Sequence, residues 1–178
     1  MGLHNFTLVI SGPVDEKLEE LFEAGCDDAL FGEVDSVHYG EFDREAPTFR
    51  EAITSAMRAV NLIDELHVER VEPEDLVTMT EIAERLARTR ESVRLLIAGE
   101  RGPGDFPAPM SHLRDRNRLW RWASVLAWWK STNGEPLGDE PAYEDAVFIA
   151  ALNSGLDWRR QRPQLQEDDA ELVDEAIA

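Results

Sequence analysis

The sequence predicts an α+β fold in which the strands are concentrated in the first half of the chain. Four short segments rich in β-forming residues lie between Phe6 and Val71. Two segments with apolar residues at helical spacing separate them. From Leu76 onward the apolar residues recur mainly at helical spacing, so we expect a largely helical second half.

The distribution of charge divides the chain at the same place. Residues 1–75 contain 5 Lys or Arg against 19 Asp or Glu, residues 76–132 contain 10 against 6, and residues 133–178 contain 3 against 12. The overall net charge of −19 argues against a simple DNA-binding protein, but the middle segment alone is positive. We expect an acidic module at 1–73, a basic unit at 74–132, and a C-terminal helix with an acidic tail at 133–178.

The acidic module has the predicted order strand, helix, strand, strand, helix, strand. The strands are expected at 6–11, 29–34, 37–42 and 66–71, with a turn at Asp35-Ser36. The first helix is expected at 15–23 with Leu18, Leu21 and Phe22 buried. The second is expected to start at Pro47 and bury Phe49, Ile53, Met57 and Val60. This order is that of a ferredoxin-like βαββαβ module.

Residues 76–99 have the pattern of a helix-turn-helix, the unit that inserts a short helix into the DNA major groove. The positions expected to face a shared core are Ile82, Ala83, Leu86, Val93, Leu96 and Ile97. Ala83 is small, as the crossing of two short helices requires. We expect Thr80 to cap the first helix, Thr89 to cap the second, and Gly99 to end it.

The segment also resembles a known group of regulators. The run Thr80–Leu86, a short turn, and Thr89–Val93 look like the helix-turn-helix of bacterial regulators. With the Gly/Pro-rich residues 99–109 and the Trp-rich residues 119–129, the order resembles the winged helix-turn-helix of AlpA, excisionase and MerR-type proteins. The resemblance covers residues 76–130. It implies a hairpin wing within 99–112 and a third helix after Trp120-Arg121.

One departure from that pattern lies in the turn. The usual Gly-apolar-Ser is replaced by Ala87-Arg88-Thr89, which leaves the turn without glycine and places a charge where a buried side chain is common. The Trp120 and Trp122 rings are expected to face the core, with the neighbouring Arg side chains directed outward.

The residues expected to contact DNA follow from the docking geometry of this motif, in which the start of the second helix reaches base edges. They are Thr89, Arg90, Glu91, Ser92 and Arg94 at the bases, and Arg101, Arg114, Arg116 and Arg118 at phosphates. Arg90 or Arg94 would bind guanine with two hydrogen bonds. Glu91 would either accept from cytosine or orient Arg94.

These observations predict a sequence-specific protein that binds double-stranded DNA through the major groove and regulates transcription. As a homodimer it would read half-sites about 34 Å apart. The acidic module would then serve a second purpose, such as capture of a basic protein partner. The alternatives are an acidic protein-interaction adaptor or antitoxin-like protein whose helix-turn-helix binds mainly protein, and a small-molecule sensor.

Other chemistry is not expected. The four His residues have no metal-ligand spacing, the single Cys26 cannot form an internal disulfide, and no nucleophile signature occurs, so we expect no enzyme, metal or cofactor. No apolar run is long enough for a membrane span, which predicts a cytoplasmic protein. A last helix is expected at 143–152, closing the core or forming a dimer interface, before an acidic tail or small amphipathic helix.

Overall fold

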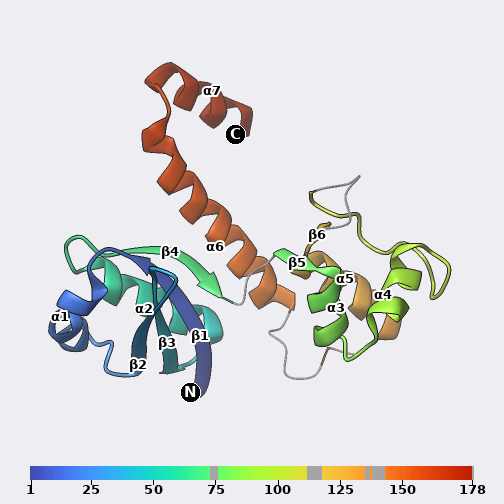
Figure 1. The fold of residues 1–178 in the computed structure, drawn as a ribbon, viewed down its shortest axis with the longest axis horizontal. Coiled ribbons are helices and arrows are strands. Elements are labelled where there is room, and N and C mark those ends of the chain that lie inside the picture. Colours follow the sequence, from blue (N-terminus) through green and yellow to red (C-terminus); the bar gives the residue numbers. More distant parts are fainter. Residues whose placement is uncertain (73–75, 112–117, 135–136, 138–142, 178) are drawn as a thin grey trace. The chain divides into compact units, whose positions relative to one another are not determined.

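The computed structural model describes residues 1–72, 76–111, 118–134, 137 and 143–177, and it confirms a mixed α+β fold with an antiparallel sheet (Figure 1). Contacts divide the chain into two compact units. The first unit comprises Met1–Pro73 and Ala151–Ala178, and the second comprises Glu74–Ala150. Residues 133–178, which the sequence sets apart as a third region, are therefore shared between the two units.

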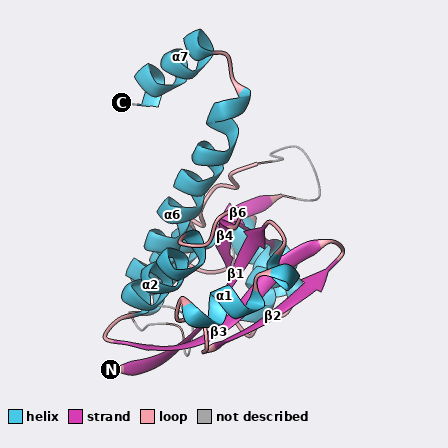
Figure 2. Ribbon diagram, turned by 90° about the vertical axis from the view of Figure 1, so that its left-hand side faces the viewer, coloured by secondary structure: helices cyan, strands magenta, loops and turns pink. Residues whose placement is uncertain are grey.

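The first unit is built on a four-stranded sheet. Its strands are β1 (Gly2–Ser11), β2 (Ala29–Val34), β3 (Val37–Ala46) and β4 (His67–Glu72), in the order β2-β3-β1-β4 with every neighbouring pair antiparallel. Figure 2 shows β2 and β3 as a long hairpin. Strand β1 begins before the expected Phe6, and β3 ends after the expected Phe42, because the two strands extend each other to the pair Gly2↔Ala46.

The helices of the first unit are the 3-10 turn η1 (Val14–Glu16), α1 (Leu18–Glu23) and α2 (Phe49–Asn61). The single helix expected at 15–23 is wrong, because Lys17 has non-helical backbone angles (φ −114°, ψ 11°) and separates η1 from α1. Of the three residues expected to be buried there, only Leu21 is; Leu18 and Phe22 are exposed. Helix α2 begins at Phe49 rather than Pro47, because the Thr48 side chain caps it by accepting a hydrogen bond from the Glu51 amide.

Apolar side chains between α2 and the sheet form the core of this unit. Phe6 on β1 stacks on Phe42 of β3 with ring centroids 5.3 Å apart, and Phe49 of α2 meets Phe6 edge-on at 6.1 Å. Ile53 and Val60 of α2 are fully buried. The expected stripe on α2 therefore faces the sheet.

One charged side chain is also buried in the first unit. Arg44 is 8% exposed, and its Nε and Nη2 donate to the two carboxylate oxygens of Asp28 at 2.7 and 2.8 Å. The hydrogen bond to Asp28 raises the pKa of Arg44. Cys26 lies buried nearby as a free thiol, and its burial raises the thiol pKa.

The C-terminal helices are α6 (Tyr143–Gln161) and α7 (Glu167–Ile177), joined by a 3-10 turn, η2 (Arg162–Gln164). The expected end of α6 at Leu152 is wrong, because the polar residues beyond it bind a strand edge. The Asn153 side chain accepts from the Val71 amide at 2.8 Å and donates to the Val71 carbonyl at 2.9 Å. Arg159 donates to the carbonyl of Val68 at 2.9 Å. These side chains occupy hydrogen-bonding groups of β4 that a further strand would otherwise use.

The second unit contains β5 (Leu76–Thr78), α3 (Met79–Arg85), α4 (Arg90–Ile97), β6 (Leu119–Arg121) and α5 (Trp122–Asn133). Strands β5 and β6 pair antiparallel, and Ser111 forms an isolated bridge to Leu119. The buried cluster consists of Val77, Ile82, Ala83, Leu86, Val93, Trp120, Trp122, Ala123, Val125, Leu126 and Ala146. The two short strands were not predicted, whereas the core positions of α3 and α4 largely were.

We expect Asn153→Ala to destabilise the first unit by about 1–2 kcal/mol, because it leaves both hydrogen-bonding groups of Val71 without their partner. Hydrogen exchange of the Val71 amide should quicken, and the urea midpoint should fall. Asn133→Ala is the matched control, since that amide bonds a helix carbonyl on the surface. Equal effects of the two substitutions would contradict the special role of Asn153.

Candidate nucleic-acid interface

Helix α3 begins with a complete capping box. The Thr78 hydroxyl accepts from the Glu81 amide at 3.3 Å, and the Glu81 carboxylate accepts from the Thr78 amide at 2.7 Å. Burial alone would raise the pKa of Glu81, but the hydrogen bonds from Thr78 together with the charge of Arg85 lower it. The expected cap at Thr80 is therefore wrong, because the extended backbone of β5 continues to Thr78 and brings that residue to the helix start.

In the turn between α3 and α4, an alanine adopts the left-handed conformation that glycine usually provides. Ala87 has φ +49°, in the left-handed region. The amide of Arg88 donates to the Ala83 carbonyl at 2.8 Å, and the amide of Ala87 donates to the Glu84 carbonyl at 3.0 Å. These bonds close the end of α3 in the manner usually seen with glycine. The left-handed conformation costs a non-glycine residue about 1–2 kcal/mol.

Helix α4 is closed at both ends as the sequence predicts. The Thr89 hydroxyl accepts from the Ser92 amide at 3.1 Å. At the other end Gly99 has φ +69°, and the amide of Glu100 donates to the Leu95 carbonyl at 2.9 Å. Val93 and Leu96 are buried between these ends, so the opposite face of the helix, with Arg90, Glu91 and Arg94, is turned to solvent.

Arg94 on that face is held by two carboxylates. Its Nε donates to both carboxylate oxygens of Glu91, at 3.0 and 3.1 Å, and its Nη2 lies 3.3 Å from Glu100. These hydrogen bonds, first that to Glu91 and then that to Glu100, raise the pKa of Arg94. The Arg94 side chain remains 45% exposed, and such exposed ion pairs contribute little energy. Glu91 thus accepts both hydrogen bonds from Arg94 Nε.

Arg90 and Arg101 differ from Arg94 in having no such partner. Both are exposed, and within the described part of the chain neither guanidinium forms a hydrogen bond or ion pair. Thr89 uses its hydroxyl as the helix cap, and Ser92 is partly buried behind the exposed face. The start of α4 thus offers one free guanidinium and one held by carboxylates.

A second set of arginines lies against tryptophan rings. Trp120 and Trp122 are buried, as predicted, at 1% and 2% exposure. The guanidinium carbons of Arg85, Arg88 and Arg118 lie 5.0, 5.3 and 5.6 Å from the ring centroids of Trp122, Trp129 and Trp120, respectively. Arg118 is half-buried with its Nε out of solvent, so it is less free to meet a phosphate than expected.

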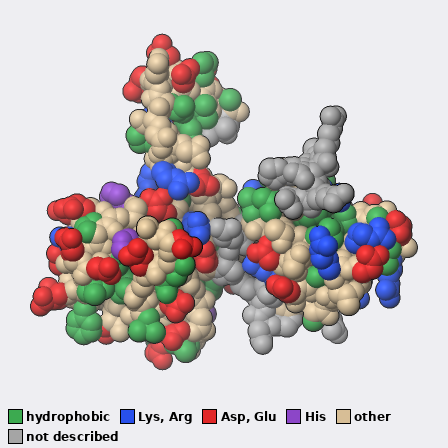
Figure 3. All heavy atoms as spheres, in the orientation of Figure 1, with side chains coloured by type: hydrophobic (Ala, Val, Ile, Leu, Met, Phe, Trp, Pro, Cys, Tyr) green, Lys and Arg blue, Asp and Glu red, His purple; other side chains and the backbone are tan. Residues whose placement is uncertain are grey.

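Sequence reasoning did not select Arg85 or Arg88 for this surface. The available signal was their position: Arg85 lies on the outer side of the first predicted helix, and Arg88 lies in the turn that follows it. Arg114 and Arg116, predicted as phosphate contacts, lie outside the described residues. Figure 3 shows Lys and Arg side chains grouped among acidic ones on the second unit, whereas acidic side chains predominate on the visible face of the sheet module.

The segment 99–112, which was expected to contain a hairpin wing, is mainly a loop in its described part, 99–111. Residues up to Pro107 form a loop that two indoles attach to the core: Trp128 Nε1 donates to the Gly104 carbonyl at 2.9 Å, and Trp120 Nε1 donates to the Pro107 carbonyl at 3.1 Å. Strand-like pairing starts only at Met110, whose amide donates to the Leu119 carbonyl at 2.7 Å. Among the described residues, Met110 and Ser111 therefore pair with β6 at Leu119.

We expect Ala87→Gly to stabilise the second unit by about 0.5–1 kcal/mol, because relief of the left-handed strain exceeds the added freedom of the unfolded chain. Urea unfolding followed by tryptophan fluorescence would measure this change. Ala98→Gly is the control: Ala98 is also exposed and ends a helix, but has φ −76°, so glycine should not stabilise there. Stabilisation by both substitutions would contradict the strain at Ala87.

None of the helices in the described part of the chain combines the length and apolarity that crossing a bilayer requires. Comparison with protein-family models finds no family that matches this chain, and searches of curated proteins and of solved structures find no match either.

Proposed function

We propose that this protein binds double-stranded DNA sequence-specifically through the second unit, with α4 in the major groove, and that it acts in transcriptional control. The exposed face of α4 carries the proposal. Arg90 and Arg94 project from it, while Val93 on the opposite side is fully buried. A helix capped at both ends and packed on its neighbour is rigid enough to present such side chains to base edges.

The arrangement around α4 supports a winged helix-turn-helix. Strand β5 precedes α3 and α4, and the Ser111–Leu119 bridge and β6 follow them, so that β6 lies between β5 and Ser111. A wing that includes Met110, Ser111 and β6 would contact the phosphate backbone beside the recognition helix. Arg101, exposed on the loop after α4, would be a phosphate contact.

The net positive charge of residues 76–132 is consistent with this role, since the segment contains ten basic and six acidic side chains. Neutralising phosphates with Arg releases counterions, which makes such binding favourable and dependent on salt. The strongly acidic module would repel the duplex at close range. Screening falls off over about 8 Å at physiological salt, so that module would have to be directed away from the duplex.

For the first unit we propose a ferredoxin-like fold. The order β2-β3-β1-β4 with antiparallel neighbours, and the alternation of its strands with α1 and α2, support that assignment. Its acidity would suit a basic protein partner, and a homodimer would allow two copies of α4 to read paired half-sites.

One observation favours a different role, that of a protein-interaction adaptor or antitoxin-like protein. Arg94, one of the two arginines best placed for guanine, is already paired with Glu91 and Glu100. In this alternative the same helix would bind protein. Selection of bound sequences from a random duplex pool by the full chain separates the two functions, because an adaptor would enrich no sequence.

With a selected site in hand, Arg94→Ala should weaken binding to that site by about 1–3 kcal/mol and affect random DNA much less, since a guanine contact is base-specific. Arg101→Ala should weaken both alike and lower the salt slope by about one. Fluorescence anisotropy at several salt concentrations measures both effects.

Arg58→Ala is the control for these substitutions, because it removes an exposed arginine from α2 in the first unit. It should leave both affinities unchanged. If Arg94→Ala has no larger effect on the selected site than on random DNA, the assignment of α4 to the groove is wrong.

Glu91→Gln should raise affinity for random DNA and reduce the preference for the selected site. The substitution removes a negative charge from the DNA-facing helix and releases Arg94 from the carboxylate that orients it. Glu84→Gln makes the same change of net charge on the exposed side of α3, away from Arg94. Competition binding with both variants tests the role of Glu91, and equal loss of preference in the two would contradict it.

A further inference from the structure

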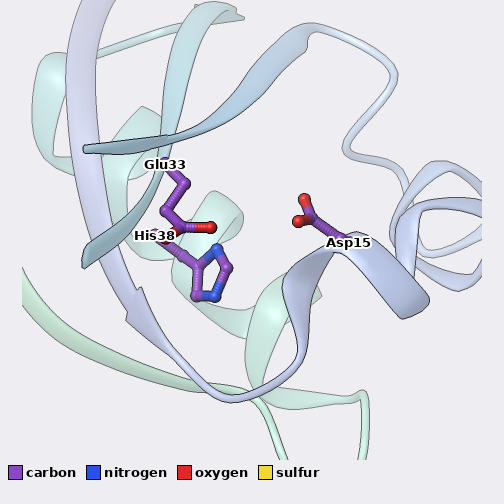
Figure 4. Close-up of side chains that lie close together, drawn as sticks. All are labelled: Asp15, Glu33 and His38. Atoms are coloured by element: carbon purple, nitrogen blue, oxygen red, sulfur yellow. The ribbon is translucent and has the colours of Figure 1, made fainter. Parts of the chain in front are cut away.

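Three potential metal ligands from different segments of the first unit converge at one place. They are Asp15 of η1, Glu33 of β2 and His38 of β3 (Figure 4). Each offers one ligand atom, and these atoms all lie within 4.8 Å of one another. Sequence spacing does not reveal the complete group, because Asp15 is distant along the chain from the two strand residues.

The hairpin fixes two of the three ligands. Glu33 and His38 are opposite each other in the β2–β3 register, so their side chains share one face of the sheet. The connecting residues, Asp35 and Ser36, have φ +51° and +64°, as in the tight turn that matches the twist of a two-residue hairpin. This turn prevents a shift of register that would separate the pair.

The third ligand, Asp15, is held by packing at the start of η1 and just before it. Val14, next to Asp15, is fully buried. Gly12 has φ +107°, and a Cβ there would lie 2.2 Å from the carbonyl oxygen of Glu65, so only glycine allows the chain to pass. The backbone that carries Asp15 is therefore anchored, while its side chain is exposed.

A second observation points to a ligand. The Nδ1 atom of His38 is out of solvent and has no hydrogen-bond partner among the described residues. A buried polar atom left unpaired in this way is costly and uncommon. Figure 4 shows a ring nitrogen of His38 turned toward the carboxylates of Glu33 and Asp15. A cation between the three groups would accept the imidazole lone pair.

We propose that Asp15, Glu33 and His38 bind one divalent transition-metal ion of the zinc class. One imidazole nitrogen with two carboxylate oxygens suits Zn²⁺, Co²⁺ or Ni²⁺, whereas Mg²⁺ and Ca²⁺ prefer oxygen ligands alone. Tetrahedral bonds of about 2.0–2.1 Å place ligand atoms about 3.4 Å apart, so the carboxylates need to move inward by about 1 Å. The surrounding acidic module favours a cation.

The test is a titration of the metal-stripped 178-residue chain with Zn²⁺ by calorimetry and with Co²⁺ by visible absorption. The expected result is one saturable site per chain and a Co²⁺ spectrum with nitrogen coordination. His38→Gln should weaken Zn²⁺ binding by about tenfold or more, since loss of even an outer partner of a ligand costs that much.

His67→Gln is the matched control, because His67 is exposed at the start of β4 and lies outside the group. It should bind Zn²⁺ like the unaltered chain. Circular dichroism would establish that both variants are folded. The proposal is overturned if the unaltered chain shows no saturable Zn²⁺ site, or if His38→Gln and His67→Gln weaken binding equally.

Discussion

The second unit depends on a ladder only three residues long. Strands β5 and β6 pair Leu76 with Arg121, Val77 with Trp120 and Thr78 with Leu119. Each end of this ladder starts a helix: Thr78 caps α3, and Trp122 is the first residue of α5. The middle pair, Val77 and Trp120, is almost completely buried. The pairing thus brings together two segments that are distant along the chain and directs three helices onto one core.

The exposed face of α4 is a consequence of that core. Val93 is fully buried, and a buried side chain of this kind contributes about 1.5–3 kcal/mol relative to exposure. Ala83 of α3 lies in the same cluster and allows the two helices to approach closely. Because this packing fixes one side of α4 against the core, the polar residues at its start point to solvent. The same packing would suit either a nucleic-acid groove or a protein surface.

The sequence predicts what local patterns determine. Apolar spacing predicts α2, α3 and α4, and the hydroxyl of Thr89 and the flexibility of Gly99 mark the ends of α4 correctly. The errors occur where a distant segment decides the outcome. Thr78 replaces Thr80 as a cap because β6 extends β5 to that residue.

The remaining differences have the same origin. Helix α6 continues beyond Leu152 because Asn153 meets a strand edge, which no helical pattern records. Asp15 comes close to His38 only in the folded unit. The turn at Asp35-Ser36 was foreseeable, and with it the pairing of Glu33 with His38, so two of these three ligands could have been grouped from the sequence.

The bonds from α6 to β4 also limit how copies of this chain could associate. Addition of a strand from another molecule needs an edge strand with free amide and carbonyl groups. On the edge strand β4, Asn153 binds both of these groups of Val71. The other edge strand of the same sheet is β2, which among the described strands pairs with β3 alone. A continuous sheet shared between two molecules would therefore join them through β2. Because a filament needs strand addition at both edges of the sheet, the covered edge at β4 makes filament growth unfavourable.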